Sequence, residues 1–240
     1  MPVRRLLTLA FAASALSAAG AISLAEAVNV DSPPFRVNGG VSPLALPRHS
    51  RVPVTFTIEG RSSRTPGADL AALTEMQVDF DRNGAVDSHG PACGRRQLEE
   101  PGCARAKVGS GVAHLEASSG PTSLPLTLYN GGSQGGAATL FVTSPRVAGA
   151  PVATVKFQSI HDRRYGLRAT VKILPLSRNL GPLRYFRLTL PRQLRSGEID
   201  GYVMARCPDG RLSAELVDYT LSDGRTFSGE PIDRTCVRGA

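Results

Sequence analysis

The segment VPVTFTIEG (Val52–Gly60) alternates between apolar and polar side chains along its length. Val54, Phe56 and Ile58 are the apolar positions, and two threonines and a glutamate follow them in turn. A period of two is typical of a β-strand whose two faces have different surroundings. We therefore predict a strand with one face against a core and the other towards solvent.

The same period recurs at short intervals along the chain. The further strand candidates are EMQVDF (75–80), SGVAHLEA (110–117), SLPLTLYN (123–130), ATLFVTS (138–144), VATVKFQSI (152–160), GLRATVKIL (166–174), LRYFRLTL (183–190), GYVMARC (201–207), RLSAELVDYTL (211–221) and GRTFS (224–228). Ten to twelve short strands with few or no helices predict an all-β fold. The expected architecture is an antiparallel β-sandwich, immunoglobulin-like or jelly-roll-like.

Turn-forming residues separate these strands. The sequence holds 25 glycines and 18 prolines in 240 residues, together about 18% against roughly 12% on average. Asp-Gly between two apolar runs is a strong short-range signal for a hairpin. CPDGRL (207–212) and LSDGRT (221–226) therefore each predict a hairpin.

The N-terminal segment has the parts of a secretory signal peptide. A positively charged start and an alanine-rich apolar stretch precede Ala25-Glu26-Ala27, which fits a small-x-small cleavage site. We predict a signal peptide over 1–27, an extended lead-in over 28–51 and a single β-sandwich-like domain over 52–240. The expected location is extracellular or at the cell envelope, with no transmembrane segment in the mature chain.

The chain has four cysteines: Cys93, Cys103, Cys207 and Cys236. An even number in an exported chain is typical of disulfides. Four cysteines allow three connectivities, and the sequence alone does not choose among them. We expect the local pairs, Cys93–Cys103 around a polar loop and Cys207–Cys236 at the C-terminal segment. Zinc and redox chemistry are disfavoured because no C-x-x-C pair is present.

VDFDRNGAVDSHG (78–90) begins like the calcium loop of an EF-hand. Its D-x-D-x-N-G order would supply oxygen ligands from Asp79, Asp81, Asn83 and Asp87. Gly90 stands where such a loop needs a bidentate glutamate, and the preceding residues alternate like a strand. The favoured interpretation is a β-hairpin, with Asn83-Gly84 in a type I′ turn and Asp79 and Asp81 on the solvent face. A weak calcium site is the alternative.

No set of residues has the spacing of a known catalytic site. GGSQG (131–135) has the letters of a nucleophile elbow around Ser133, but an elbow needs a helix after the serine, and the following residues have a strand pattern. The histidines are not paired at ligand spacing, and Glu99-Glu100 are simply adjacent in a loop. We expect a non-enzymatic protein, with a secreted hydrolase as the alternative.

The formal net charge is +8 at pH 7, and most of the positive charge is arginine. A solvated basic surface explains this charge, and attraction to anionic cell-envelope polymers is the alternative. Nucleic acid is not expected as a partner of an exported protein. Only 5% of the residues are aromatic and none is tryptophan, so stacking platforms for carbohydrate or single-stranded nucleic acid are poorly supplied.

The combination of VDFDRNGAVDSHGPAC, QLEEPGCARAKVGSG, LYNGG, ATLFV, RYGL and a late CPDG resembles a group of uncharacterised exported proteins from high-GC actinobacteria. The resemblance covers about Val52 to Cys236. It implies an exported β-rich fold and a Cys93–Cys103 disulfide, and it supplies neither a ligand nor a catalytic residue. We therefore expect a non-enzymatic binding or structural component outside the cell or at its envelope.

Overall fold

The computed structural model describes residues 35–63, 71–98, 100–117, 119–147, 149–174, 181–195 and 198–238. The chain divides into two units, Met1–Asp31 and Ser32–Ala240. The predicted signal peptide lies outside the described residues, so the description below concerns the second unit alone.

Nearly all regular structure in the second unit is β-strand, which confirms the all-β prediction. The strands are β1 (Phe35–Ser42), β2 (Ala45–Leu46), β3 (Val52–Ser62), β4 (Leu73–Asp81), β5 (Gly84–Val86), β6 (Lys107–Ala117), β7 (Gly120–Gln134), β8 (Ala137–Thr143), β9 (Ala153–Ser159), β10 (Tyr165–Ile173), β11 (Leu183–Leu190), β12 (Gln193–Arg195), β13 (Glu198–Asp200), β14 (Val203–Ala205), β15 (Arg211–Leu221), β16 (Thr226–Phe227), β17 (Pro231–Thr235) and β18 (Val237–Arg238). Two short 3-10 helices, η1 (Arg95–Gln97) and η2 (Pro101–Ala106), precede β6. The strands outnumber the ten to twelve expected for two reasons. Strands of two or three residues are too short to show alternation, and the longer strands β1 and β17 lie outside the segments predicted as strands.

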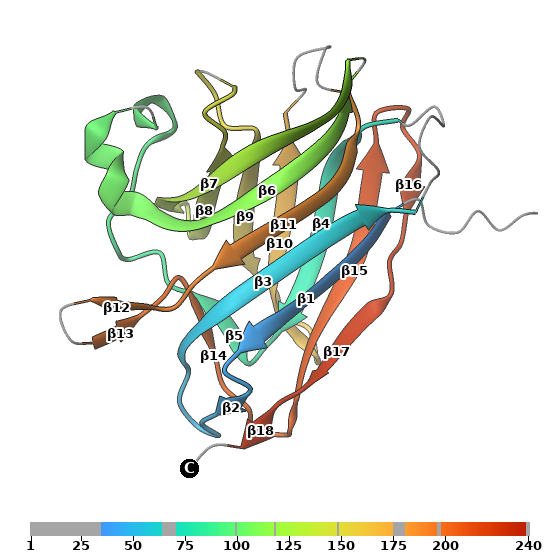
Figure 1. Ribbon diagram of the computed structural model, residues 1–240. Coiled ribbons are helices and arrows are strands. Elements are labelled where there is room, and N and C mark those ends of the chain that lie inside the picture. Colours follow the sequence, from blue (N-terminus) through green and yellow to red (C-terminus); the bar gives the residue numbers. More distant parts are fainter. Residues whose placement is uncertain are drawn as a thin grey trace, which may run out of the picture. The chain divides into compact units, whose positions relative to one another are not determined.

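One large antiparallel sheet contains most of these strands (Figure 1). Its order is β16-β15-β4-β10-β9-β8-β7-β6-β11-β3-β14-β5, with β1 added beside β3 and β17 added beside β15. Two-stranded pairs of β12 with β13 and of β2 with β18 complete the described structure. The sheet therefore has many consecutive strands joined by short turns, as the turn-rich sequence indicated.

The sheet curls so that its inner face encloses the core. Phe56 in β3 and Phe80 in β4 lie far apart in the strand order, yet their ring centroids are 5.6 Å apart with an edge-on geometry. Phe35 in β1 likewise contacts Tyr219 in β15, with a centroid distance of 6.4 Å. Strands at opposite ends of the sheet thus face each other across one apolar interior, which is the sandwich-like arrangement that the sequence predicted.

The lead-in expected over 28–51 contributes to the fold, as far as the structure describes it. β1 pairs with β3 along its whole length, from Phe35 opposite Ser62 to Ser42 opposite Thr55. Phe35 is only 5% exposed and belongs to the main core. The described part of the sandwich therefore begins at β1, and the predicted boundary at residue 52 is placed too late.

The two Asp-Gly turns have different outcomes. LSDGRT joins β15 to β16, which pair as an antiparallel hairpin, so this prediction is confirmed. CPDGRL joins β14 to β15, but β14 pairs with β3 and β5 while β15 pairs with β4, β16 and β17. The second hairpin prediction is wrong, because the pairing of β14 is decided by distant strands rather than by its own turn.

Candidate functional site

The D-x-D-x-N-G segment does not form the expected hairpin. β4 ends at Asp81 and β5 begins at Gly84, but β4 pairs with β10 and β15 whereas β5 pairs with β14. Gly84 is not among the glycines with a positive φ, so the type I′ turn, which needs a positive φ at both central residues, is absent there. The segment instead carries the chain from one part of the sheet to another.

Three of its polar residues are buried, which corrects the expected solvent face. The exposed fractions of Asp79, Asp81 and Asn83 are 5%, 8% and 2%. The alternation itself was interpreted correctly, because Val78 and Phe80 line the interior of the sheet while Asp79 lies on the opposite face. On that face the carboxylate of Asp79 is covered by Arg168, so burial there is produced by a neighbouring strand.

Asp81 and Asn83 belong to a network of protein donors. Asp81 accepts hydrogen bonds from the backbone N–H groups of Asn83 at 2.8 Å and Ser213 at 3.3 Å. The side-chain oxygen of Asn83 accepts a hydrogen bond from Arg206 Nε at 3.1 Å. Burial raises the pKa of Asp81 above its usual value, and the two backbone donors oppose that shift only in part. The network fixes the corner between β4 and β5.

Asp87 lies apart from this network. It accepts hydrogen bonds from the backbone N–H of His89 at 3.0 Å and from the ring of the same residue at 2.9 Å. These contacts, the backbone bond foremost, lower the pKa of Asp87. Within the described ranges no group of three or more His, Cys, Asp or Glu side chains is placed to hold a metal ion. The calcium site stays a prediction that a titration tests.

The GGSQG segment (131–135) around Ser133 lies in a hairpin. Ser133 sits near the end of β7, opposite Ala138 of β8, and is exposed. Gly135 and Gly136 form the turn, with φ of 60° and 82°, values that favour glycine and fit a hairpin turn. A strand rather than a helix follows the serine, so the geometry of a nucleophile elbow is not formed.

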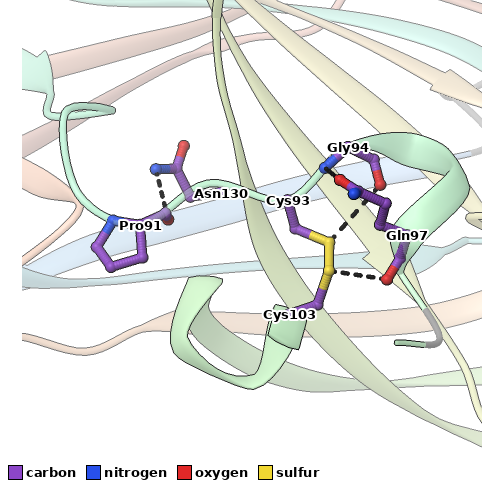
Figure 2. The surroundings of a disulfide bond; sticks show 6 residues. All are labelled: Pro91, Cys93, Gly94, Gln97, Cys103 and Asn130. Carbon is purple, nitrogen blue, oxygen red and sulfur yellow. Dashed lines mark hydrogen bonds between the residues drawn. A yellow bond between two sulfur atoms is a disulfide. The ribbon is translucent and has the colours of Figure 1, made fainter. Parts of the chain in front are cut away.

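Both local disulfides are present in the structure. Cys93 and Cys103 join the two ends of a loop that contains η1, and their Cα atoms are 5.4 Å apart. Cys207 and Cys236 hold the C-terminal segment, with Cα atoms 6.1 Å apart. The backbone oxygen of Asn130 accepts a hydrogen bond from the backbone N–H of Cys93 at 2.9 Å. Figure 2 shows the side chain of Asn130 between Pro91 and Cys93 of the first disulfide.

The most distinctive feature of the interior is a pair of cavities. The first has a volume of about 110 Å³ and is lined by residues of β1, β3, β4, β5, β14, β15 and β17, among other positions. Its walls are mainly apolar, with Arg234, Asn38, Asp81 and Ser213 as polar contributors. The second has a volume of about 130 Å³, and every residue that lines it is apolar.

The two cavities adjoin one another. The residues that line both are Phe56, Ile58, Val78, Phe80, Phe157 and Leu190. An apolar cavity of about 150 Å³ engineered into another protein stays dry and binds benzene. The interior of this sheet therefore offers two neighbouring apolar spaces of comparable size, separated only by side chains.

Small side chains on the inner face help to create this space. Ala214 in β15 lines the first cavity between Leu212 and Leu216, and Ala169 in β10 lines the second between Leu167 and Val171 along its strand. The sequence contained this signal, since an alanine at an inward position between larger apolar residues predicts a gap. Alternation shows which side chains point inward, whereas a gap depends on the sizes of those side chains.

Within the described residues, no helix is long and apolar enough to cross a membrane. The comparisons with known proteins add no identification: no family model matches the chain, and no curated protein or solved structure matches it.

Proposed function

We propose that this chain is an exported, non-enzymatic binding protein that holds an apolar small molecule inside its curled sheet. The observation that supports the proposal is the pair of adjoining apolar cavities. Protein interiors are normally packed as densely as organic crystals. Apolar side chains that line empty space lack contact partners on one side. A ligand in the spaces of about 110 Å³ and about 130 Å³ would supply those contacts.

The exported location is part of the proposal and rests on other observations. The N-terminal sequence has the pattern of a signal peptide, and the chain forms two disulfides, which persist in oxidising compartments outside the cytosol. Membership of the uncharacterised exported proteins of high-GC actinobacteria belongs to the same proposal and rests on the sequence resemblance alone.

Binding of the neutral fluorescent probe 1-naphthylamine, which is small enough for the two spaces, tests the proposed function. We expect a saturable blue shift of its emission in the presence of the folded protein. Ala214→Leu should reduce the affinity by filling the first cavity, and Ala169→Leu should do so by filling the second. The matched control is Ala104→Leu, the same change at an exposed alanine of η2.

Thermal unfolding of the same variants distinguishes the filling of a cavity from damage to the fold. A leucine that occupies empty space should preserve or raise the melting temperature of the protein while it lowers the affinity for the probe. The proposal would be overturned by the absence of saturable probe binding to the wild-type protein, or by probe affinities of both filled variants equal to that of the wild type. Turnover in a hydrolase screen that Ser133→Ala abolishes would overturn its non-enzymatic part.

A further inference from the structure

Two edges of the sheet meet beside the first cavity without backbone pairing. Among the described strands, β1 pairs only with β3, and β17 pairs only with β15. The side chain of Arg234 in β17 crosses to β1, where its Nε donates to the backbone oxygen of Gly39 at 2.9 Å and its Nη2 donates to Asn38 Oδ1. We call this junction, Asn38–Gly40 with Arg234, the seam. A side chain rather than a backbone ladder closes it.

The charge of Arg234 has only neutral acceptors at the seam. They are an amide oxygen and backbone carbonyls, including the carbonyl of Asp233 at 3.1 Å. In the part of the chain that the structure describes, no carboxylate forms an ion pair with Arg234. The carboxylate of Asp233 is used by Arg164 and by Ser213, whose hydroxyl donates at 2.6 Å. Arg234 is thus a charged donor without a charged acceptor.

The same arginine lies at the polar side of the first cavity. Arg234, Asn38 and Gly40 all line that cavity, so the apolar space reaches the seam. A Cβ built on Gly40 would meet no atom within 4 Å, which shows that the seam is not packed tightly from that side. Opening the seam at Asn38–Gly40 breaks the hydrogen bonds of one side chain and no backbone ladder, so the seam offers a route into the interior.

Asp81 is the other charged residue in the lining. Its two carboxylate oxygens accept the hydrogen bonds from Asn83 and Ser213 at the β4–β5 corner. Both carboxylate oxygens of Asp81 therefore have donors. The planar guanidinium of Arg234, whose present acceptors are neutral, is suited to bidentate binding of an anionic oxygen pair in their place.

We propose that the cavity takes a single-chain amphiphile with an anionic head, an alkyl carboxylate, whose chain lies among the apolar side chains and whose carboxylate binds Arg234 at the seam. This inference rests on the proposed function and adds the ligand class and the residue that selects it. A cavity of about 150 Å³ in another protein holds benzene, which has six carbon atoms. By the same ratio, the two spaces here together hold roughly ten carbon atoms.

Displacement of 1-naphthylamine by decanoate, decan-1-ol and decyltrimethylammonium tests the ligand class, since the three share a chain and differ in head group. We expect wild-type protein to bind decanoate at least about tenfold more tightly than decan-1-ol, because a charge-assisted hydrogen bond is the difference. Arg234→Gln should remove that preference and leave the affinity for decan-1-ol unchanged. Arg36→Gln, which removes an exposed charge from β1, the strand that Arg234 contacts, should keep the preference.

The outcomes separate the two proposals. Equal displacement by decanoate and decan-1-ol in the wild-type protein, or a preference that survives Arg234→Gln, overturns the assignment of Arg234 while the apolar binding function stands. Absence of probe binding overturns both.

A second measurement needs no variant and so does not depend on whether Arg234→Gln folds. The carboxyl pKa of ¹³C-labelled decanoate, followed by NMR, should be lower in the complex than in free solution because of the guanidinium. An unchanged or raised pKa of the bound carboxyl would contradict the contact with Arg234.

Discussion

Arg168 binds both carboxylate oxygens of Asp79, through Nε to Oδ1 at 2.7 Å and through Nη2 to Oδ2 at 2.8 Å. The two residues lie directly opposite each other in β10 and β4. The side chain of Asp79 is 7% exposed and that of Arg168 is 36% exposed. The pair is therefore a bidentate contact on the outer face of the sheet, with the carboxylate covered and the guanidinium partly hydrated.

Arg168→Met should destabilise the protein by about 2 kcal/mol. Removing one partner of a fully buried pair costs roughly 3–5 kcal/mol because a charge is left uncompensated, and the partial exposure of Arg168 reduces that figure. Urea unfolding measures the change. Lys172→Met, which breaks the more exposed Lys172–Glu75 pair between the same two strands, is the control and should cost at most about 0.5 kcal/mol. Equal effects of the two substitutions would contradict the buried role of Asp79.

Asp81 should make the protein less stable as pH rises through the mildly acidic range. Its pKa in the folded protein is raised above the ordinary value of 3.8 by burial. Between pH 3.8 and the pKa of Asp81 in the folded protein, the folded state binds more protons than the unfolded state. The free energy of unfolding therefore falls with rising pH in that window. Its contribution is fully present below pH 3.8 and is lost as pH passes the folded-state pKa.

The difference in unfolding free energy between wild type and Asp81→Asn isolates this effect. The variant lacks the titrating group, so the wild type should lose stability relative to it as pH rises across the window. The relevant quantity is the slope of this difference against pH, because the introduced asparagine also changes the hydrogen bonds from Asn83 and Ser213. A pH-independent difference would show that burial does not control this carboxyl.

Gly60→Ala should cost about 3 kcal/mol because the core has no room for a methyl group there. An added Cβ would lie 2.4 Å from ring atoms of both Phe35 and Phe186, which stack with a centroid distance of 5.9 Å. Gly40→Ala is the matched control in the neighbouring strand, since its Cβ would meet nothing within 4 Å. Thermal unfolding should show a large drop for the first variant and little change for the second.

Patterns within short stretches of sequence predicted the features that depend on residues close together in the chain. The alternation in β3 and in β4 up to Phe80 correctly assigned inward and outward positions, because side chains of any strand alternate between faces. It was wrong for Asp81, which was expected on the solvent face and lines the first cavity. It did not predict the burial of Asp79, because the covering group, Arg168, lies 89 residues away. The Asn83-Gly84 hairpin failed because β5 pairs with β14 instead of β4.

The candidate site was the least predictable part for the same reason. Arg234 meets Asn38 across 196 residues of sequence, and no pattern near either residue indicates the contact. Cavity volume depends on how several strands from both ends of the sheet face one another. The inward alanines were visible in the sequence, but their partners across the interior were set by the curl of the sheet.

Asn130→Asp should be strongly destabilising even though the two side chains have the same shape. Asn130 is 1% exposed, and its Nδ2 donates to three backbone oxygens, those of Ser88 at 3.1 Å, Gly90 at 3.2 Å and Pro91 at 3.1 Å. Figure 2 shows the contact with Pro91 beside the disulfide. A carboxylate would place negative charge against three acceptors, so a loss of at least about 3 kcal/mol is expected at pH 7.

The loss should become smaller in acid, which distinguishes repulsion from simple loss of packing. Burial next to carbonyl oxygens favours the protonated form of the introduced carboxyl, which can then donate one hydrogen bond. Urea unfolding at pH 7 and at pH 4.5 measures the difference. Gln97→Glu is the control, because Gln97 is exposed and its side chain uses only its oxygen, as acceptor for the Gly94 N–H at 3.3 Å. If the loss of unfolding free energy caused by Asn130→Asp is the same at both pH values, the three carbonyl groups do not depend on the Nδ2 donor of Asn130.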